Sequence, residues 1–206
     1  MILSFSLSLS VFLSLTPYPS LSHRWTCRTA SRSWMLYISS MQNMTFGGKH
    51  GGLLPACRAA MLAQRKPEGL CFMAPHMVAF IETPAFAFNS RFDQFQLGSI
   101  LQLVNWTTAP QRQAVLSFGG SFLDQLAPLL SNGRHGAFIS TCICHGCPWD
   151  DLEIDGRTSY QEYGAWMLDS TIDDAKSQTL AAGKHVHIDR RGPDGGGTIE
   201  GKCQAF

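Results

Sequence analysis

Two stretches decide the fold class of this chain: TPAFAFNSRFD at residues 83–93 and HGAFISTCICH at residues 135–145. Each holds a short apolar run bounded by turn-forming residues, which favours a buried strand of an α/β sheet over a helix. Between them, residues 94–104 and 111–130 carry apolar side chains close to helical spacing. This order of strand, helices and strand predicts a parallel sheet with flanking helices.

The residues that end these stretches are candidates for acyl-transfer chemistry. Asp93 follows the first run and His145 ends the second, and catalytic groups in such sheets lie beyond the carboxyl ends of the strands. An imidazole can act as a general base near neutral pH, and a carboxylate can hold it in the right tautomer. His145 and Asp93 are therefore a candidate base and acid, in the chain order of an α/β-hydrolase. The alternatives are a structural histidine and a helix N-cap.

Composition limits the class of protein. The chain has 206 residues, of which 45% are hydrophobic and 15% are charged. It is long enough for one domain with a substantial core, and its composition is not that of a disordered chain. The formal net charge of +1 gives no electrostatic reason to expect nucleic acid or an anionic membrane as a partner.

The N-terminal residues divide into two segments before the domain begins. Residues 1–22 are apolar and serine-rich, which predicts a signal peptide or a mispredicted start, because no basic residue precedes the apolar run. A membrane span is not expected, since the run is short and is broken at Pro17 and Pro19. Residues 23–52 have no clear period and are expected to be irregular. The domain is expected to occupy residues 53–206.

Seven cysteines favour disulfides in an oxidising compartment, and hence a secreted protein, or a metal site. A bond between Cys57 and Cys71 is favoured over two buried thiols and would stabilise the fold by about 3 kcal/mol. The cluster of Cys142, Cys144, His145 and Cys147 could instead hold zinc through three thiolates and an imidazole. A local bond between Cys144 and Cys147, or free thiols, is favoured over that zinc site.

The remaining periodicity predicts secondary structure at the two ends of the domain. Helices are expected over residues 55–64, 76–81, 159–168 and 171–182. Residues 185–189 form a candidate edge strand, with His185 and His187 expected on a solvated face. Residues 150–156 are expected to be an acidic surface loop.

Several blocks between about residues 40 and 190 together resemble the C-terminal half of the pectin acetylesterase/Notum family. They are Leu54-Pro55-x-Cys57, Leu70-Cys71-Phe72, Thr83-Pro84-x-Phe86, Phe92-Asp93-x-Phe95-Gln96-Leu97 and the run from Gly136 to His145. The resemblance implies the C-terminal part of an α/β-hydrolase fold and a Ser–His–Asp carboxylesterase, with Asp93 as acid and His145 as base. It implies an acetylated polysaccharide or an acylated protein as substrate, and no cofactor. It also implies a Cys57–Cys71 bond and a bond from Cys142 to a downstream cysteine, for which Cys203 is the nearest candidate.

The chain departs from that family at the nucleophile. No Gly-x-Ser-x-Gly occurs in the 206 residues, and the Gly-Gly-x-Trp-Cys stretch of the oxyanion site is missing as well. Members of a catalytic triad act as a unit, so the other two contribute little without the serine. We therefore expect an incomplete sheet and no esterase activity from this chain by itself. The alternatives are a non-catalytic secreted or remnant protein with a disulfide scaffold, or a Cys/His zinc-binding module.

Overall fold

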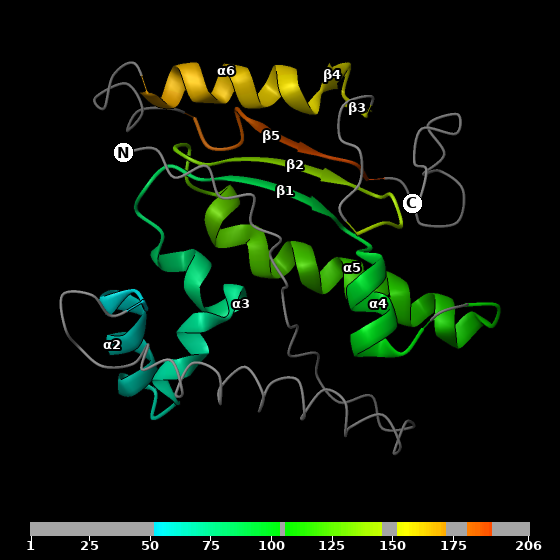
Figure 1. Ribbon diagram of the computed structural model, residues 1–206, viewed down its shortest axis with the longest axis horizontal. Coiled ribbons are helices and arrows are strands. Elements are labelled where there is room, and N and C mark those ends of the chain that lie inside the picture. Colours follow the sequence, from blue (N-terminus) through cyan, green and yellow to red (C-terminus); the bar gives the residue numbers. More distant parts are fainter. Residues whose placement is uncertain (1–51, 104–105, 146–151, 172–180, 191–206) are drawn as a thin grey trace.

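A three-stranded parallel sheet with helices on both faces forms the centre of the computed structural model, which describes residues 52–103, 106–145, 152–171 and 181–190 (Figure 1). Its strands are β1 (Phe86–Ser90), β2 (Gly136–Ser140) and β5 (Val186–Ile188), in the order β1-β2-β5. Phe88 of β1 lies opposite Phe138 of β2. This sheet confirms the predicted α/β class and both buried strands.

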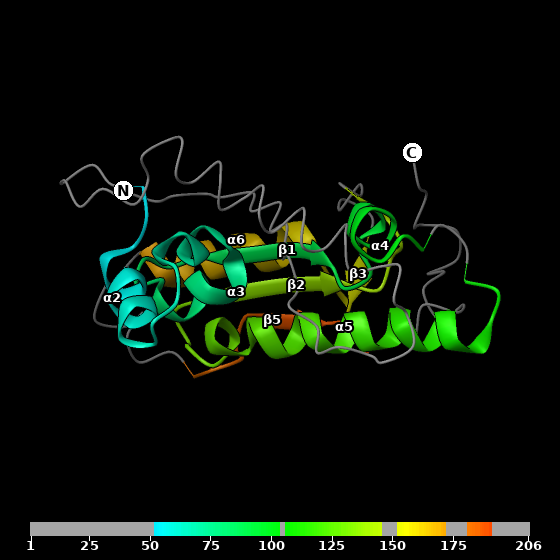
Figure 2. The same ribbon diagram turned by 90° about the horizontal axis from the view of Figure 1, so that it is seen from below.

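The two faces of the sheet are covered by different helices. Ala87, Ala137 and Ile139 pack in one apolar cluster with helix α5 (Ala109–Leu130). Phe86 and Phe138 point to the opposite face, where they meet helix α6 (Ser159–Thr171). Figures 1 and 2 show α5 and α6 on opposite sides of the strands. The alternation of side chains along each strand thus produces two separate halves of the core.

Helix α5 is long because both its start and its buried face are well specified. Thr108 and Gln111 form a capping box at its N-terminus, which satisfies backbone N–H groups that lack a partner in the first turn. Gly119 lies in the buried face, and a Cβ there would collide with the ring of Phe92. The glycine that weakens the helix in isolation therefore allows it to approach the segment that follows β1.

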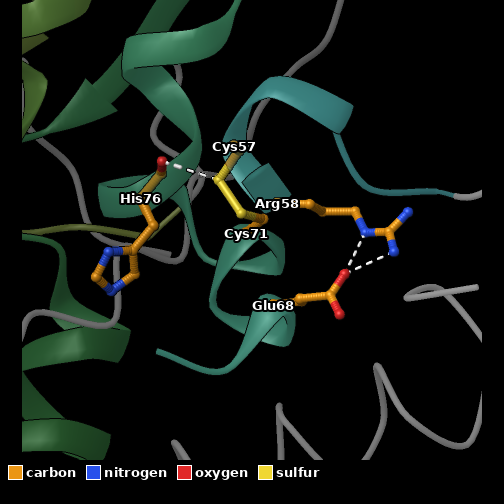
Figure 3. The surroundings of a disulfide bond; sticks show 5 residues. All are labelled: Cys57, Arg58, Glu68, Cys71 and His76. Carbon is orange, nitrogen blue, oxygen red and sulfur yellow. Dashed lines mark hydrogen bonds and ion pairs between the residues drawn. A yellow bond between two sulfur atoms is a disulfide. The ribbon is translucent and has the colours of Figure 1, made fainter. Parts of the chain in front are cut away.

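A third apolar cluster lies at the start of the described chain. It is built on α2 (Pro55–Ala63) and the 3-10 helix η1 (Glu68–Phe72), followed by α3 (Ala74–Met77) and the 3-10 helix η2 (Val78–Phe80). Cys57 of α2 and Cys71 of η1 form a disulfide with a Cα–Cα distance of 5.9 Å (Figure 3). Beside it, Arg58 and Glu68 make an ion pair at 2.6 Å. The helix expected over residues 76–81 is divided between α3 and η2.

Two elements differ from the predicted boundaries. Helix α4 (Gln94–Leu101) stops before residue 104, because Gln102 adopts a left-handed backbone conformation with φ of 54°. The acidic loop expected over residues 150–156 contains part of a hairpin, β3 (Glu153–Ile154) and β4 (Arg157–Thr158). Asp155 and Gly156 form its turn with φ of 54° and 74°, and an Asp-Gly pair is a hairpin signal.

Two further points concern the ends of the described chain. Helix α6 runs to Thr171, and most of the helix expected over residues 171–182 lies outside the described residues. The expected strand at 185–189 is present as β5. Among the described residues, no helix combines the length and the apolar character needed to cross a membrane.

Candidate active site

Asp93 and His145 lie together at the carboxyl edge of the sheet. Asp93 follows β1 after a two-residue turn, and His145 is the fifth residue after β2. Because β1 and β2 are parallel neighbours, their carboxyl ends meet at the same edge (Figure 1). Asp93 Oδ2 lies 2.8 Å from His145 Nδ1. The sequence predicted these two residues as a pair, and the fold brings them into direct contact across 52 positions of the chain.

Asp93 is the N-cap of a helix and also contacts His145. Its Oδ1 accepts a hydrogen bond of 2.8 Å from the backbone N–H of Gln96, so it is the N-cap of α4. Its Oδ2 contacts His145. The side chain is only 7% exposed, and the cap fixes the direction in which the second oxygen points. One carboxylate therefore begins the helix and orients the imidazole.

The contact with Asp93 determines which ring nitrogen of His145 carries the proton. A carboxylate only accepts hydrogen bonds, so the proton of the neutral ring lies on Nδ1 and the lone pair lies on Nε2. The His145 side chain is 45% exposed. The ring of Phe95 lies beside it, with centroids 5.2 Å apart and an interplanar angle of 36°. Nε2 is thus the ring nitrogen that can take a proton from a nucleophile.

Hydrogen bonds tie together the two segments that carry this pair. The backbone N–H of Gln94 donates to the carbonyl of Cys144 at 3.3 Å. Ser90 donates its hydroxyl hydrogen to the carbonyl of Cys142, while its oxygen accepts from the N–H of Phe92 at 3.0 Å. These bonds hold the turn after β1 against the segment after β2, and they limit how far Asp93 and His145 can separate.

The third strand supports the same segment through residues that the sequence did not identify. Asp189 follows β5, and its Oδ2 accepts from the hydroxyl of Thr141 at 2.6 Å. Its backbone N–H donates to the carbonyl of Ile139 at 2.8 Å. Burial lowers the pKa of the Arg91 guanidinium, and the charge of Asp189 acts on it in the opposite direction. The sequence did contain a signal for Asp189, namely an acidic residue directly after the third strand. An acid after a strand is also the pattern that indicated Asp93.

The cysteines of this segment do not offer the ligands that a zinc site requires. Cys142 and Cys144 are both buried and both disulfide-bonded, and a disulfide sulfur is not a thiolate. The hypothesis of three zinc-binding thiolates beside His145 is therefore wrong. The described residues contain no group of three His, Cys, Asp or Glu side chains placed to hold a metal. Cys147 and Cys203, and with them the implied Cys142–Cys203 bond, lie outside the described residues.

Comparison with known proteins identifies the family. The sequence model of the pectinacetylesterase family matches residues 38–182, well over half of the chain. The chain belongs to the pectinacetylesterase family. Pectin acetylesterase 11 of Arabidopsis thaliana is 31% identical over 108 residues, which cover 45% of this chain and 26% of the relative. Pectin acetylesterase 7 of the same plant is 27% identical over 126 residues, which cover 53% and 31%.

A solved structure supports the fold. The Wnt deacylase Notum from Drosophila superposes with a TM-score of 0.50 and 19% identity, over 68% of this chain and 36% of the Notum chain. This superposition confirms the predicted α/β-hydrolase fold. The matched part of the chain corresponds to only 26% and 31% of the two curated relatives and to 36% of the Notum chain.

Proposed function

We propose that Asp93 and His145 are the acid and the base of a Ser–His–Asp carboxylesterase whose nucleophile is not among these 206 residues. The observation that carries the proposal is the 2.8 Å contact between Asp93 Oδ2 and His145 Nδ1 at the carboxyl edge of the sheet. Membership of the pectinacetylesterase family supports ester hydrolysis as the reaction.

The geometry suits the established steps of acyl transfer. A serine hydroxyl near His145 would attack the ester carbonyl while Nε2 takes its proton, and the imidazolium would then protonate the departing alcohol. Water would release the acyl group from the serine by the same route. Asp93 would hold the ring and stabilise the imidazolium as it forms. The names of the curated relatives favour an acetyl ester of a polysaccharide, whereas Notum is a Wnt deacylase.

By itself, the 206-residue chain should not hydrolyse esters. Neither a Gly-x-Ser-x-Gly nucleophile motif nor the Gly-Gly-x-Trp-Cys stretch occurs in it. Oxyanion donors are often the largest electrostatic contribution to catalysis. Removing one member of the triad eliminates most of the rate enhancement that the triad provides.

The described cysteines support an oxidising compartment for this protein. Cys57, Cys71, Cys142 and Cys144 are all disulfide-bonded. Disulfides persist in secreted and extracellular proteins and are rare in reducing compartments. We therefore include secretion in the proposed function.

A chimera tests the catalytic roles. The N-terminal part of Arabidopsis pectin acetylesterase 11, up to where the match to this chain begins, is joined to residues 53–206, and hydrolysis of p-nitrophenyl acetate is measured. We expect activity from the chimera and only the buffer rate from the 206-residue chain. His145→Gln and Asp93→Asn in the chimera should each lower kcat by about 10,000-fold. Asp124→Asn, on the exposed side of α5, is the matched control and should leave kcat unchanged.

Two results would contradict the proposal. An active chimera that tolerates His145→Gln would remove this residue from the catalytic machinery. Esterase activity of the 206-residue chain that disappears in His145→Gln would place a nucleophile within the chain.

A further inference from the structure

Strand β5 brings a buried acidic residue to the edge of the sheet where Asp93 and His145 meet. Asp189 follows β5 directly and is only 5% exposed. Thr141, which is 1% exposed, follows β2 directly and precedes His145 in the same segment. Because β2 and β5 are parallel neighbours, Thr141 and Asp189 lie together beyond the carboxyl ends of these two strands.

A short side-chain hydrogen bond joins Thr141 to Asp189. The Thr141 hydroxyl donates to Asp189 Oδ2 at 2.6 Å, a length typical of a hydroxyl bound to a carboxylate, which is among the stronger hydrogen bonds in proteins. The backbone N–H of Asp189 donates to the carbonyl of Ile139 at 2.8 Å. Asp189 is therefore bonded both to β2 itself and to the first residue beyond it.

On the side of β1, the same segment is held through its backbone carbonyl groups. The Ser90 hydroxyl bonds to the carbonyl of Cys142, and the N–H of Gln94 donates to the carbonyl of Cys144. The bond to β5 differs from these two, because it holds a side chain at the start of the segment. The segment that carries His145 is therefore supported from both neighbouring strands, β1 and β5.

Strand β5 can act as a support because polar contacts fix it to helix α6. Glu162 of α6 lies 2.6 Å from His185 Nδ1 through Oε1 and 3.0 Å from His187 Nε2 through Oε2. Lys184 Nζ and His185 Nε2 lie 2.5 Å and 2.9 Å from Asp169 Oδ2, and their hydrogen bonds hold the pKa of Asp169 below its usual value. The expectation of a solvated face is wrong for His185, whose side chain is 5% exposed, because α6 covers that face of the strand (Figure 1).

We propose that Thr141 and Asp189 are positioning residues, and that the hydrogen bond between them holds His145 in contact with Asp93. This role rests on the proposed esterase function. Neither residue would touch the substrate, because both are almost completely buried, whereas the side chain of His145 is 45% exposed. Without the bond, the segment would lose its support from β5, and the imidazole could leave the position from which Nε2 takes a proton. A displacement of about 1 Å can lower a catalytic rate by about 100-fold.

Kinetics of the chimera described above test the role in catalysis. Thr141→Val keeps the shape of the side chain and removes the hydroxyl. It should lower kcat for p-nitrophenyl acetate by about 10- to 100-fold and leave KM unchanged, since the buried side chain does not reach the substrate. Thr141→Ser keeps the hydroxyl and should retain most of kcat. Asp189→Ala should lower kcat as far as Thr141→Val does, and the double variant should be no slower than the slower single variant, because both substitutions remove the same bond. If Asp189→Ala does not fold, the two variants of Thr141 still decide.

Gly136→Ala is the control that separates positioning from a general loss of stability. Gly136 is the first residue of β2, at the end opposite Thr141, and a Cβ there would lie 2.4 Å from the ring of Phe86. This variant should therefore destabilise the same strand while kcat stays unchanged. An equal fall of kcat in Gly136→Ala and Thr141→Val would overturn the proposal. So would wild-type kcat in Thr141→Val, or a Thr141→Ser variant as slow as Thr141→Val.

Amide hydrogen exchange in the 206-residue chain tests the support without any esterase activity. The N–H of Gln94 reports on the segment, because it donates to the carbonyl of Cys144 next to His145. Thr141→Val should speed its exchange about fivefold relative to the amide of the buried Phe118 in α5, as expected for the loss of one hydrogen bond. Unchanged relative exchange would overturn the proposal even if the chimera is active. An inactive chimera would contradict the proposed esterase instead, and the exchange rates would still decide whether the bond to β5 holds this segment.

Discussion

Two substitutions of Asp93 can separate its role as the N-cap of α4 from its contact with His145. Asn keeps an oxygen that can accept from the N–H of Gln96, and Asn and Asp are equally good N-caps. Ala removes both the cap and the contact with His145. Loss of an N-cap costs about 1 kcal/mol, and a hydrogen bond from a half-exposed imidazole to the carboxylate contributes about 1 kcal/mol. We expect Asp93→Asn to cost up to about 1 kcal/mol and Asp93→Ala to cost about 1 kcal/mol more.

Urea unfolding at pH 7 measures both variants against the wild type. Asp124→Ala on the exposed side of α5 is the control and should change stability by less than about 0.5 kcal/mol. NMR of His145 adds a second measurement, because the side-chain amide that Asp93→Asn introduces can donate an N–H to Nδ1 and so move the ring proton to Nε2. Equal destabilisation by Asn and Ala would refute the cap assignment. An unchanged His145 tautomer in Asp93→Asn would refute the orienting role.

Three further predictions concern other parts of the fold. Replacing Cys57 and Cys71 by serine should cost about 3 kcal/mol in urea unfolding, and a reductant should remove the difference from the wild type. Gly136→Ala should cost about 1–3 kcal/mol by thermal unfolding, because a Cβ there collides with aromatic rings of β1 and α6. Lys184→Gln should weaken the acid dependence of stability: the lowered pKa of Asp169 gives stability that is present above about pH 3.9 and lost as pH falls below it. An acid titration of Lys184→Gln identical to that of the wild type would contradict this.

The sheet and its helices were predictable because each depends on a local pattern. The runs before Ser90 and Ser140 are short, apolar and bounded by turn residues, and they fold as β1 and β2. The apolar spacing of α5 is equally local. Boundaries were less predictable, because Gln102 ends α4 through its backbone conformation and no residue type enforces that end.

The polar network around β5 was not predictable, because it depends on contacts between distant segments. His185 and His187 alternate with apolar residues, and alone this pattern fits a half-solvated edge strand. Glu162, which is buried against them, is 23 residues from His185. Thr141 and Asp189, at 48 residues apart, were missed for the same reason.

Asp93 and His145 were predictable because strand ends place side chains at a known edge of the sheet. Their contact does not require the part of an esterase that would bring the serine. The cap on Gln96, the bond from Gln94 to Cys144 and the Ser90 bridge all come from described residues of this chain. The pair is therefore preorganised, while His145 remains 45% exposed. In the proposed esterase, this chain would supply the geometry of the acid and base, and the missing part would supply the nucleophile. A chimera that supplies only the missing part should for that reason gain activity without any change at Asp93 or His145.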